Sequence, residues 1–224
     1  VERGGTPVAF VRQWRGFTDG HPRGFSATIE TLAWIGSILL GIDHALRPQA
    51  SIMSQLTWYI TIGPHELGHV ICIPFGTLLT FLGGTIWQLL PFAFLAAFTL
   101  WRHKRIGQAA LFWTVVGHSF IDISVYAADA QERNLDLLFN LPKTSHDWWN
   151  ILTMLNLLPY DNLIGALFAS AGLMTIITAG GIAILSIWSL PRQGIGNTRY
   201  TGNFWVALSD SLQPSADQRA VVEV

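Results

Sequence analysis

The chain has 224 residues, of which 50% are hydrophobic and only 12% are charged. Soluble domains carry about 25% charged residues, so this composition argues against an ordinary soluble domain and for an integral membrane protein. The net charge of −1 and the lack of a basic patch give no sign of a nucleic-acid partner, and the lone Cys72 excludes an intramolecular disulfide and a cysteine-rich metal site.

The apolar runs predict an all-α, polytopic integral membrane protein with about five transmembrane helices and a short interfacial helix. A polar N-terminal segment is expected at 1–25, a helical transmembrane domain at 26–190 and a polar tail at 191–224. The interfacial helix is predicted at 146–158, where two tryptophans suit a membrane boundary. The predicted spans cover about 30–46, 52–72, 84–101, 106–128 and 160–190.

A piece rich in Gly and Pro, 74–84, lies between the second and third predicted spans. It is apolar but poor as a helix, and non-helical backbone at membrane depth must line a cavity or be buried in protein. If all five spans cross, the basic residues divide evenly between the two sides. The basic cluster at 102–105 lies closest to a span, which favours a cytoplasmic location for its side.

The second predicted span contains His65-Glu66-Leu67-Gly68-His69, an H-E-x-x-H pattern. Positions i and i+4 share one face of a helix, so both imidazoles can bind one Zn²⁺. Glu66 lies beside that face, where a carboxylate can act as the general base for a zinc-activated water. Glu66 is also the only charged residue between Pro48 and Trp101. An ionised residue inside a span costs about 2.5–3.5 kcal/mol on insertion scales, which favours a function over simple helix packing.

A zinc ion held by two histidines needs a further protein ligand. His146, at the start of the predicted interfacial helix, is the first choice from the residues. Asp161, Asp122 and Asp147 remain alternatives, and Asp147 is equally suited to capping the interfacial helix.

His118 and Asp122 lie four residues apart on the fourth predicted span and form a polar stripe with Tyr126. We expect this stripe to face the protein interior. Asp122 is then placed to orient a metal-bound histidine, with His118 beside it. The alternative is a hydrogen bond between helices that has only a structural role.

The stretch "PHELGHV", 64–70, followed by a Gly-rich apolar piece, resembles the site-2 protease family of intramembrane zinc metalloproteases. In that family a later N-x-x-P…L-D-G segment supplies an aspartate ligand. The resemblance implies this role for Asp161 in "LNLLPYDNLIG", although Leu-Asp-Gly is absent. A looser likeness to uncharacterised bacterial membrane proteins that pair H-E-x-G-H with a later H-D-W favours His146 and a bacterial inner membrane.

Two functions are therefore expected. The first is an integral-membrane zinc metallohydrolase of the intramembrane peptidase type, which acts on a transmembrane peptide within the lipid bilayer. The second is a non-catalytic, protease-derived subunit of a larger membrane complex, such as a respiratory or photosynthetic assembly, with a structural metal site. The ten tryptophans, the small-residue stretches and the lack of a substrate-selecting domain suit the second function.

Overall fold

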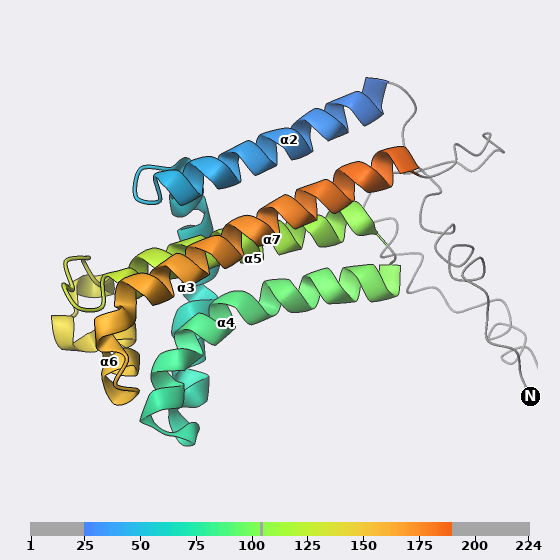
Figure 1. The fold of residues 1–224 in the computed structure, drawn as a ribbon. Helices are drawn as coiled ribbons and strands as arrows, with labels where there is room; N and C mark the ends of the chain where they lie inside the picture. Colours follow the sequence, from blue (N-terminus) through green and yellow to red (C-terminus); the bar gives the residue numbers. More distant parts are fainter. Residues whose placement is uncertain (1–24, 104, 190–224) are drawn as a thin grey trace, which may run out of the picture. The chain divides into compact units, whose positions relative to one another are not determined.

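A computed structural model describes residues 25–103 and 105–189, and all regular structure in these residues is helical. The predicted polar segments therefore lie outside the described residues, apart from Phe25. The helices are α2 (Phe25–Leu46), α3 (Ile52–Cys72), α4 (Thr77–Phe98), α5 (Ile106–Ala128), α6 (Asp147–Met154) and α7 (Asp161–Ser189) (Figure 1). Short helical turns cover Ile73–Phe75, Thr99–His103, Leu138–Asn140, Lys143–Ser145 and Leu158–Tyr160.

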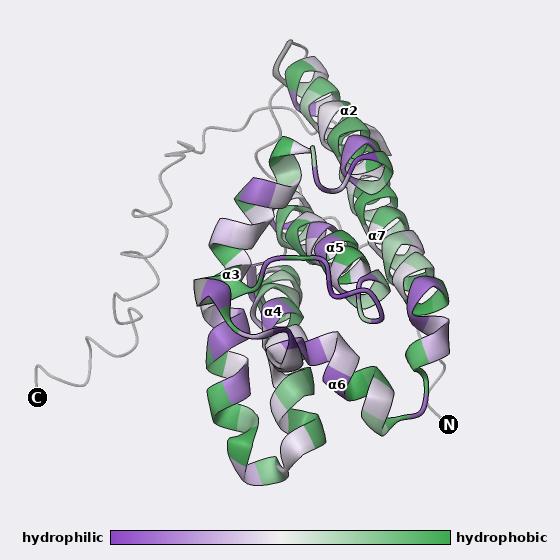
Figure 2. Ribbon diagram, turned by 90° about the vertical axis from the view of Figure 1, so that its left-hand side faces the viewer, coloured by the Kyte–Doolittle hydropathy of each residue, from purple (hydrophilic) through white to green (hydrophobic). Residues whose placement is uncertain are grey.

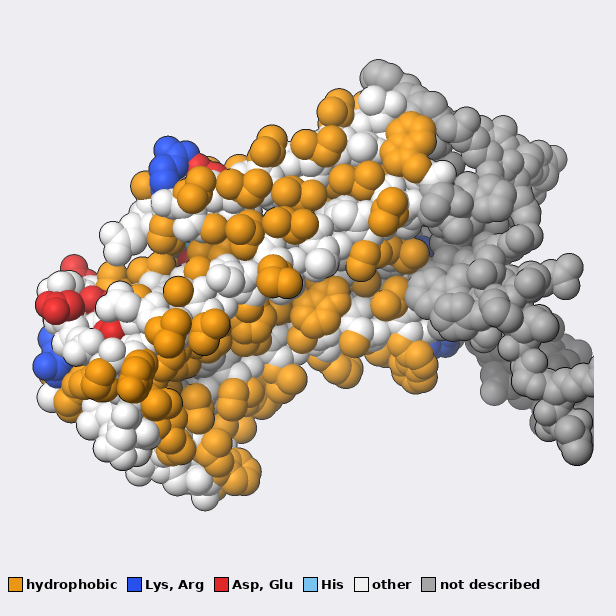
Figure 3. Space-filling view, in the orientation of Figure 1, with side chains coloured by type: hydrophobic (Ala, Val, Ile, Leu, Met, Phe, Trp, Pro, Cys, Tyr) orange, Lys and Arg blue, Asp and Glu red, His pale blue; other side chains and the backbone are white. Residues whose placement is uncertain are grey.

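The described chain contains four segments that are long and apolar enough to cross a membrane, where the sequence had suggested five. They are Ala27–Leu46, Thr77–His103, Ile106–Ala128 and Leu158–Trp188. The predicted second span is a helix, α3, but it is not among the four. Polar residues interrupt its apolar run, and the ribbon of α3 in Figure 2 has purple hydrophilic stretches between green ones. On the face drawn in Figure 3, hydrophobic side chains cover the flanks of the helices and charged side chains gather at the ends.

The Gly- and Pro-rich piece at 74–84 is more helical than the sequence suggested. After a short turn at Ile73–Phe75, Gly76 adopts φ +95°, a conformation that glycine reaches at little cost. The chain then reverses and α4 begins at Thr77. It continues through Gly83 and Gly84, because packing against a neighbouring helix outweighs the low helix propensity of glycine.

The backbones of α3 and α4 touch at these glycines. A Cβ atom on Gly68 would lie 2.1 Å from the carbonyl oxygen of Gly83, and one on Gly83 would lie 2.4 Å from that of Gly68. Small residues permit such close approach between helices in membrane proteins. Gly68 thus makes room for α4.

The long helices α2, α5 and α7 pack side by side, with α7 antiparallel to both neighbours (Figure 1). Glycine again sets the spacing, since a Cβ on Gly172 of α7 would lie 2.6 Å from the carbonyl oxygen of Gly117 on α5. A Cβ on Gly41 of α2 would lie 2.7 Å from Ile176 of α7.

A compact apolar cluster holds α6 against the end of α5. It contains Ile123 and Ala127 of α5 with Trp148, Ile151 and Leu152 of α6. Trp148 is only 5% exposed, so this tryptophan lies in the protein interior, although the sequence had suggested a membrane boundary. The cluster fixes the N-terminal end of α6, where Asp147 lies.

The glycine contacts predict that Gly172→Ala destabilises the chain, whereas Gly181→Ala on the same helix does not. The first substitution overpacks α7 against α5 and should lower the free energy of unfolding by about 1–3 kcal/mol. A Cβ at Gly181 would have nothing within 4 Å, so its substitution should be neutral or slightly stabilising. Unfolding in mixed micelles measures both values, and equal losses would contradict the contact.

Candidate metal centre

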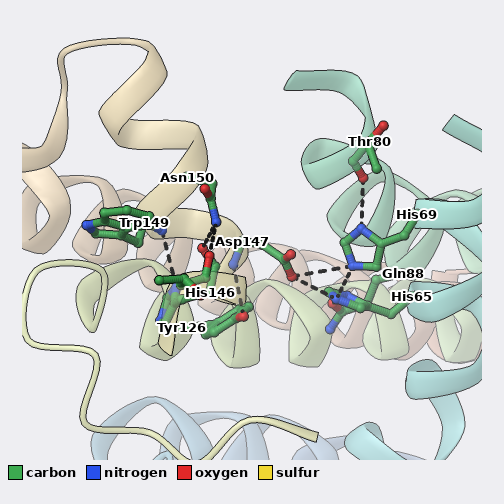
Figure 4. A network of polar contacts seen from close by, with 10 residues as sticks. His65, His69, Thr80, Gln88, Tyr126, His146, Asp147, Trp149 and Asn150 are labelled. Carbon is green, nitrogen blue, oxygen red and sulfur yellow. Dashed lines mark hydrogen bonds and ion pairs between the residues drawn. The ribbon is translucent and has the colours of Figure 1, made fainter. Parts of the chain in front are cut away.

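The two histidines of the H-E-x-x-H pattern lie one helical turn apart on α3 and turn their rings toward each other. Their Nε2 atoms are 3.1 Å apart (Figure 4). The Oδ2 atom of Asp147, at the start of α6, lies 3.3 Å from Nε2 of His65 and 3.4 Å from Nε2 of His69. Among the described residues, these three side chains form a group that could hold a metal ion.

Hydrogen bonds to α4 determine which ring nitrogens carry protons. Nδ1 of His69 lies 2.8 Å from the carbonyl oxygen of Thr80, which can only accept, so Nδ1 must donate. Nδ1 of His65 lies 3.1 Å from Oε1 of Gln88 and donates in the same way. In the neutral rings both Nε2 atoms are then acceptors. Metal-bound histidines in proteins are oriented by this type of contact.

Three electron-rich atoms therefore converge with no donor between them. Lone pairs at such distances repel unless a cation lies among them. Ligands bound tetrahedrally at about 2.0–2.1 Å lie about 3.3 Å from one another, which matches the three separations in this group. Two imidazoles and one carboxylate also leave one position open, as in catalytic zinc sites.

Asp147 is held in place from two directions. Its backbone N–H donates to the hydroxyl of Tyr126 on α5 at 3.1 Å. Burial alone raises the pKa of the Asp147 carboxyl, but the contacts with His65 and His69 outweigh burial and lower that pKa below its ordinary value. The carboxylate is therefore ionised at neutral pH, as a metal ligand requires.

Gly84 of α4 closes the group from the remaining side. A Cβ atom at this position would lie 2.5 Å from Nε2 of His69 and 2.7 Å from Nε2 of His65. Any side chain here would enter the space between the ligand atoms. The glycine thus keeps that space free for a small occupant.

The group lies in the wall of a cavity of about 380 Å³. Glu66, an exposed residue of α3, lines the same cavity, as do Thr85 and Gln88 of α4. Asp122 and Tyr126 of α5 line the side formed by that helix. Connections near α6 also contribute, including Leu135, Asp136, Leu137, Leu138, Leu141 and Ser145.

The structure places the other predicted ligands elsewhere. His146, the first choice for the third ligand, caps α6, since its Nδ1 accepts from the backbone N–H of Trp149 at 3.2 Å. Its Nε2 lies 3.4 Å from Oδ2 of Asp129. The sequence had suggested His146 as the metal ligand and Asp147 as a helix cap. In the structure Asp147 lies with the two histidines, and His146 caps α6.

Asp161, the aspartate suggested by the family resemblance, lies at the start of α7. Its carboxylate accepts hydrogen bonds from the backbone and side-chain amides of Gln131, at 3.1 and 3.0 Å. It is 1% exposed and is not in the group with His65 and His69.

The predicted polar stripe on α5 faces the interior, as expected, but its partner lies on α2. His44 contacts both His118 and Asp122, at 2.9 and 3.0 Å. The predicted orienting role belongs to Gln88 and Thr80 of α4. A lone amide in an apolar span could have indicated Gln88, whereas the Thr80 backbone carbonyl leaves no signal in a sequence.

Comparison with known proteins adds no relative, since no family model, no curated protein and no solved structure matches the chain. The case for a metal centre therefore depends on the geometry of His65, His69 and Asp147.

The geometry predicts that Asp147→Asn loses bound metal and His146→Asn retains it. Asn at 147 removes the anionic ligand with little change of shape, and Asn at 146 still caps the helix. We expect the first substitution, like His65→Ala, to weaken metal affinity by more than about tenfold. Elemental analysis of purified protein after mild chelator treatment measures the metal content. Metal loss in His146→Asn with retention in Asp147→Asn would reverse the assignment.

Proposed function

We propose that this chain is a membrane-embedded zinc metallohydrolase of the peptidase type. One observation carries the proposal: two histidine nitrogens and an aspartate oxygen converge in the wall of a cavity that Glu66 also lines. The ligand set of two imidazoles and one carboxylate suits Zn²⁺, and its open fourth position suits catalysis more than a structural site. When bound, zinc would polarise a carbonyl group and acidify a water molecule.

Glu66 is the residue placed to move protons. It follows His65 directly on α3, is exposed and lines the cavity. In peptide hydrolysis, water adds to the carbonyl carbon and the C–N bond breaks. Glu66 takes a proton from the attacking water and returns it to the leaving amine, so that protons balance over the reaction.

The four apolar segments support a multi-pass location, and we propose the bacterial inner membrane. If these four segments cross, α3 and the turn after it do not cross, so the end of α2 and the start of α4 lie on the same side of the membrane. The start of α2, the 102–105 cluster and the end of α7 then share one side, with Arg23 and Arg192 adjoining it in the sequence. Arg47, Arg133 and Lys143 belong to the opposite side, which carries α6.

The positive-inside rule makes the side of the 102–105 cluster cytoplasmic. The cavity includes Pro48, Gln49 and residues 135–141, which belong to connections on the other side. Substrate would therefore enter from the extracytoplasmic face of the membrane.

This topology predicts opposite labelling of two single cysteines in a Cys72→Ala background. Glu132→Cys should react with an impermeant maleimide in intact spheroplasts, and Arg102→Cys should react only after permeabilisation. Both positions are exposed, so a difference reports the side and not burial. Labelling of Arg102→Cys alone in intact spheroplasts would invert the orientation.

The mechanism predicts that Glu66→Gln retains zinc and loses hydrolysis. The amide keeps the size of the side chain but cannot accept a proton, so the cleavage rate should fall by about 10²–10⁴-fold. A transmembrane peptide with a fluorophore and quencher, reconstituted with the protein, reports cleavage, and elemental analysis reports zinc. Cleavage by Glu66→Gln at the wild-type rate would contradict the mechanism.

The same assays distinguish the hydrolase from the alternative function, a non-catalytic subunit of a membrane complex. That reading predicts full zinc content in the unmodified protein, no cleavage of the peptide, and a partner that co-purifies in a fixed ratio.

A further inference from the structure

A second polar group lies beside the candidate metal centre. It joins α2 to α5, and the residues that it brings together are more than 70 positions apart in the sequence. His44 of α2 contacts His118 of α5 through their Nδ1 atoms at 2.9 Å. Nε2 of His44 lies 3.0 Å from Oδ1 of Asp122. His44 is 0% exposed and His118 is 2% exposed, so this chain of contacts is buried between apolar helices. Burial of that kind is unfavourable unless the polar groups are bonded.

The chain ends at the cavity, where the carboxylate of Asp122 presents its second oxygen. Oδ2 of Asp122 is buried without a hydrogen-bond partner, and Asp122 lines the cavity. Protons can be placed along the chain in two ways, with His44 donating to Asp122 or accepting from it. Asp122 is a carboxylate only in the first arrangement, because in the second it carries the proton on Oδ1. In the first arrangement Oδ2 is a charged acceptor. No hydrogen bond or ion pair of the described residues reaches this oxygen.

A second unpartnered oxygen faces the same space. The hydroxyl of Thr85 on α4 is buried and has no hydrogen-bond partner, and Thr85 is 7% exposed. Thr85 also lines the cavity, one residue after the glycine that adjoins the ligand histidines. Buried polar atoms are bonded in the great majority of cases, so two unpartnered oxygens in one cavity indicate a missing ligand that forms hydrogen bonds.

The charges around the cavity indicate the charge of this missing ligand. Four carboxylates are among the lining residues, those of Glu66, Asp122, Asp136 and Asp147, and no lysine or arginine is among them. A zinc ion would offset the charges nearest to it, those of Asp147 and Glu66. The carboxylate of Asp122 would remain, with His44 and the uncharged Ser54 for neighbours and no lysine or arginine.

We propose that Asp122 anchors a cationic group of the substrate, an ammonium or guanidinium, through Oδ2. The proposal rests on the hydrolase function above and names its substrate class. Such a cation comes from a lysine or arginine side chain or from a free amino terminus. Asp122 precedes Tyr126 by four residues, about 6 Å along a helix, and Tyr126 holds Asp147. The cation would therefore lie within a few residues of the bond that is cut.

Peptide binding to Glu66→Gln protein tests the anchor without any turnover. The probes are fluorescent twelve-residue peptides in which a single lysine, or the uncharged norleucine, is moved through each position. Each peptide is made with a free and with an acetylated amino terminus. A charged hydrogen bond predicts that lysine improves affinity at least about tenfold over norleucine at one or more positions, if the cation is a side chain. If it is a terminal amine, acetylation should weaken binding by the same factor.

Adding Asp122→Asn should remove this preference while zinc content stays unchanged. Asp43→Asn is the matched control, because it removes one negative charge next to His44 from a carboxylate that pairs with Arg47 and is not among the cavity-lining residues. We expect the preference to persist in this control. A preference that survives Asp122→Asn, or that disappears equally in Asp43→Asn, would overturn the proposal.

The peptide series also tests the anchor if Asp122→Asn fails to fold, since equal affinity for all charged and uncharged peptides would overturn it. Failure of the hydrolase function has a different signature. In that case the protein with Glu66 intact would bind the cationic peptides selectively and leave them uncut.

Discussion

The candidate metal centre depends on the direct backbone contact between α3 and α4. Gly68 and Gly83 bring the two helices so close that neither position has room for a Cβ atom. This proximity lets Gln88 and the Thr80 carbonyl reach the Nδ1 atoms of the two histidines on α3. Wider spacing would leave those nitrogens without acceptors, and the ring orientation that points both Nε2 atoms at Asp147 would be lost.

The third member of the group comes from a different part of the fold, and its position is set by apolar packing. The cluster of Ile123 and Ala127 with Ile151 and Leu152 fixes α6 on the end of α5. The Tyr126 hydroxyl then accepts from the backbone of Asp147. The position of the carboxylate thus follows from a rigid hydrophobic contact and one hydrogen bond. Such support from outside the site is what holds metal ligands in a defined geometry.

Several polar and ionisable side chains of the described helices line one cavity. The ligand histidines, Glu66, Asp122 and Thr85 all line it, and the bonded pair His44 and His118 lies directly behind Asp122. Polar groups are unfavourable in apolar surroundings, and they persist where they are bonded to one another or to a ligand. The two proposals concern the same cavity. The hydrolase function accounts for the metal ligands, and the binding of a substrate cation accounts for the carboxylate of Asp122.

The amino-acid sequence by itself determined the helical class, most helix positions and the His65-Glu66-His69 face, because these depend on apolar runs and on the repeat of a single helix. What the sequence did not predict has physical causes. The count of candidate membrane spans among the described residues changed because α3 is helical but too polar to join the four apolar segments. The helical path through Gly83 and Gly84 depends on a neighbour that local propensity does not include. Only the tertiary structure decided that Asp147 meets the histidines, that His146 caps α6 and that His44 joins Asp122. The contacts of Asp147 and His44 join segments more than 70 residues apart, and the docking of α6 and the packing of α2 determine them.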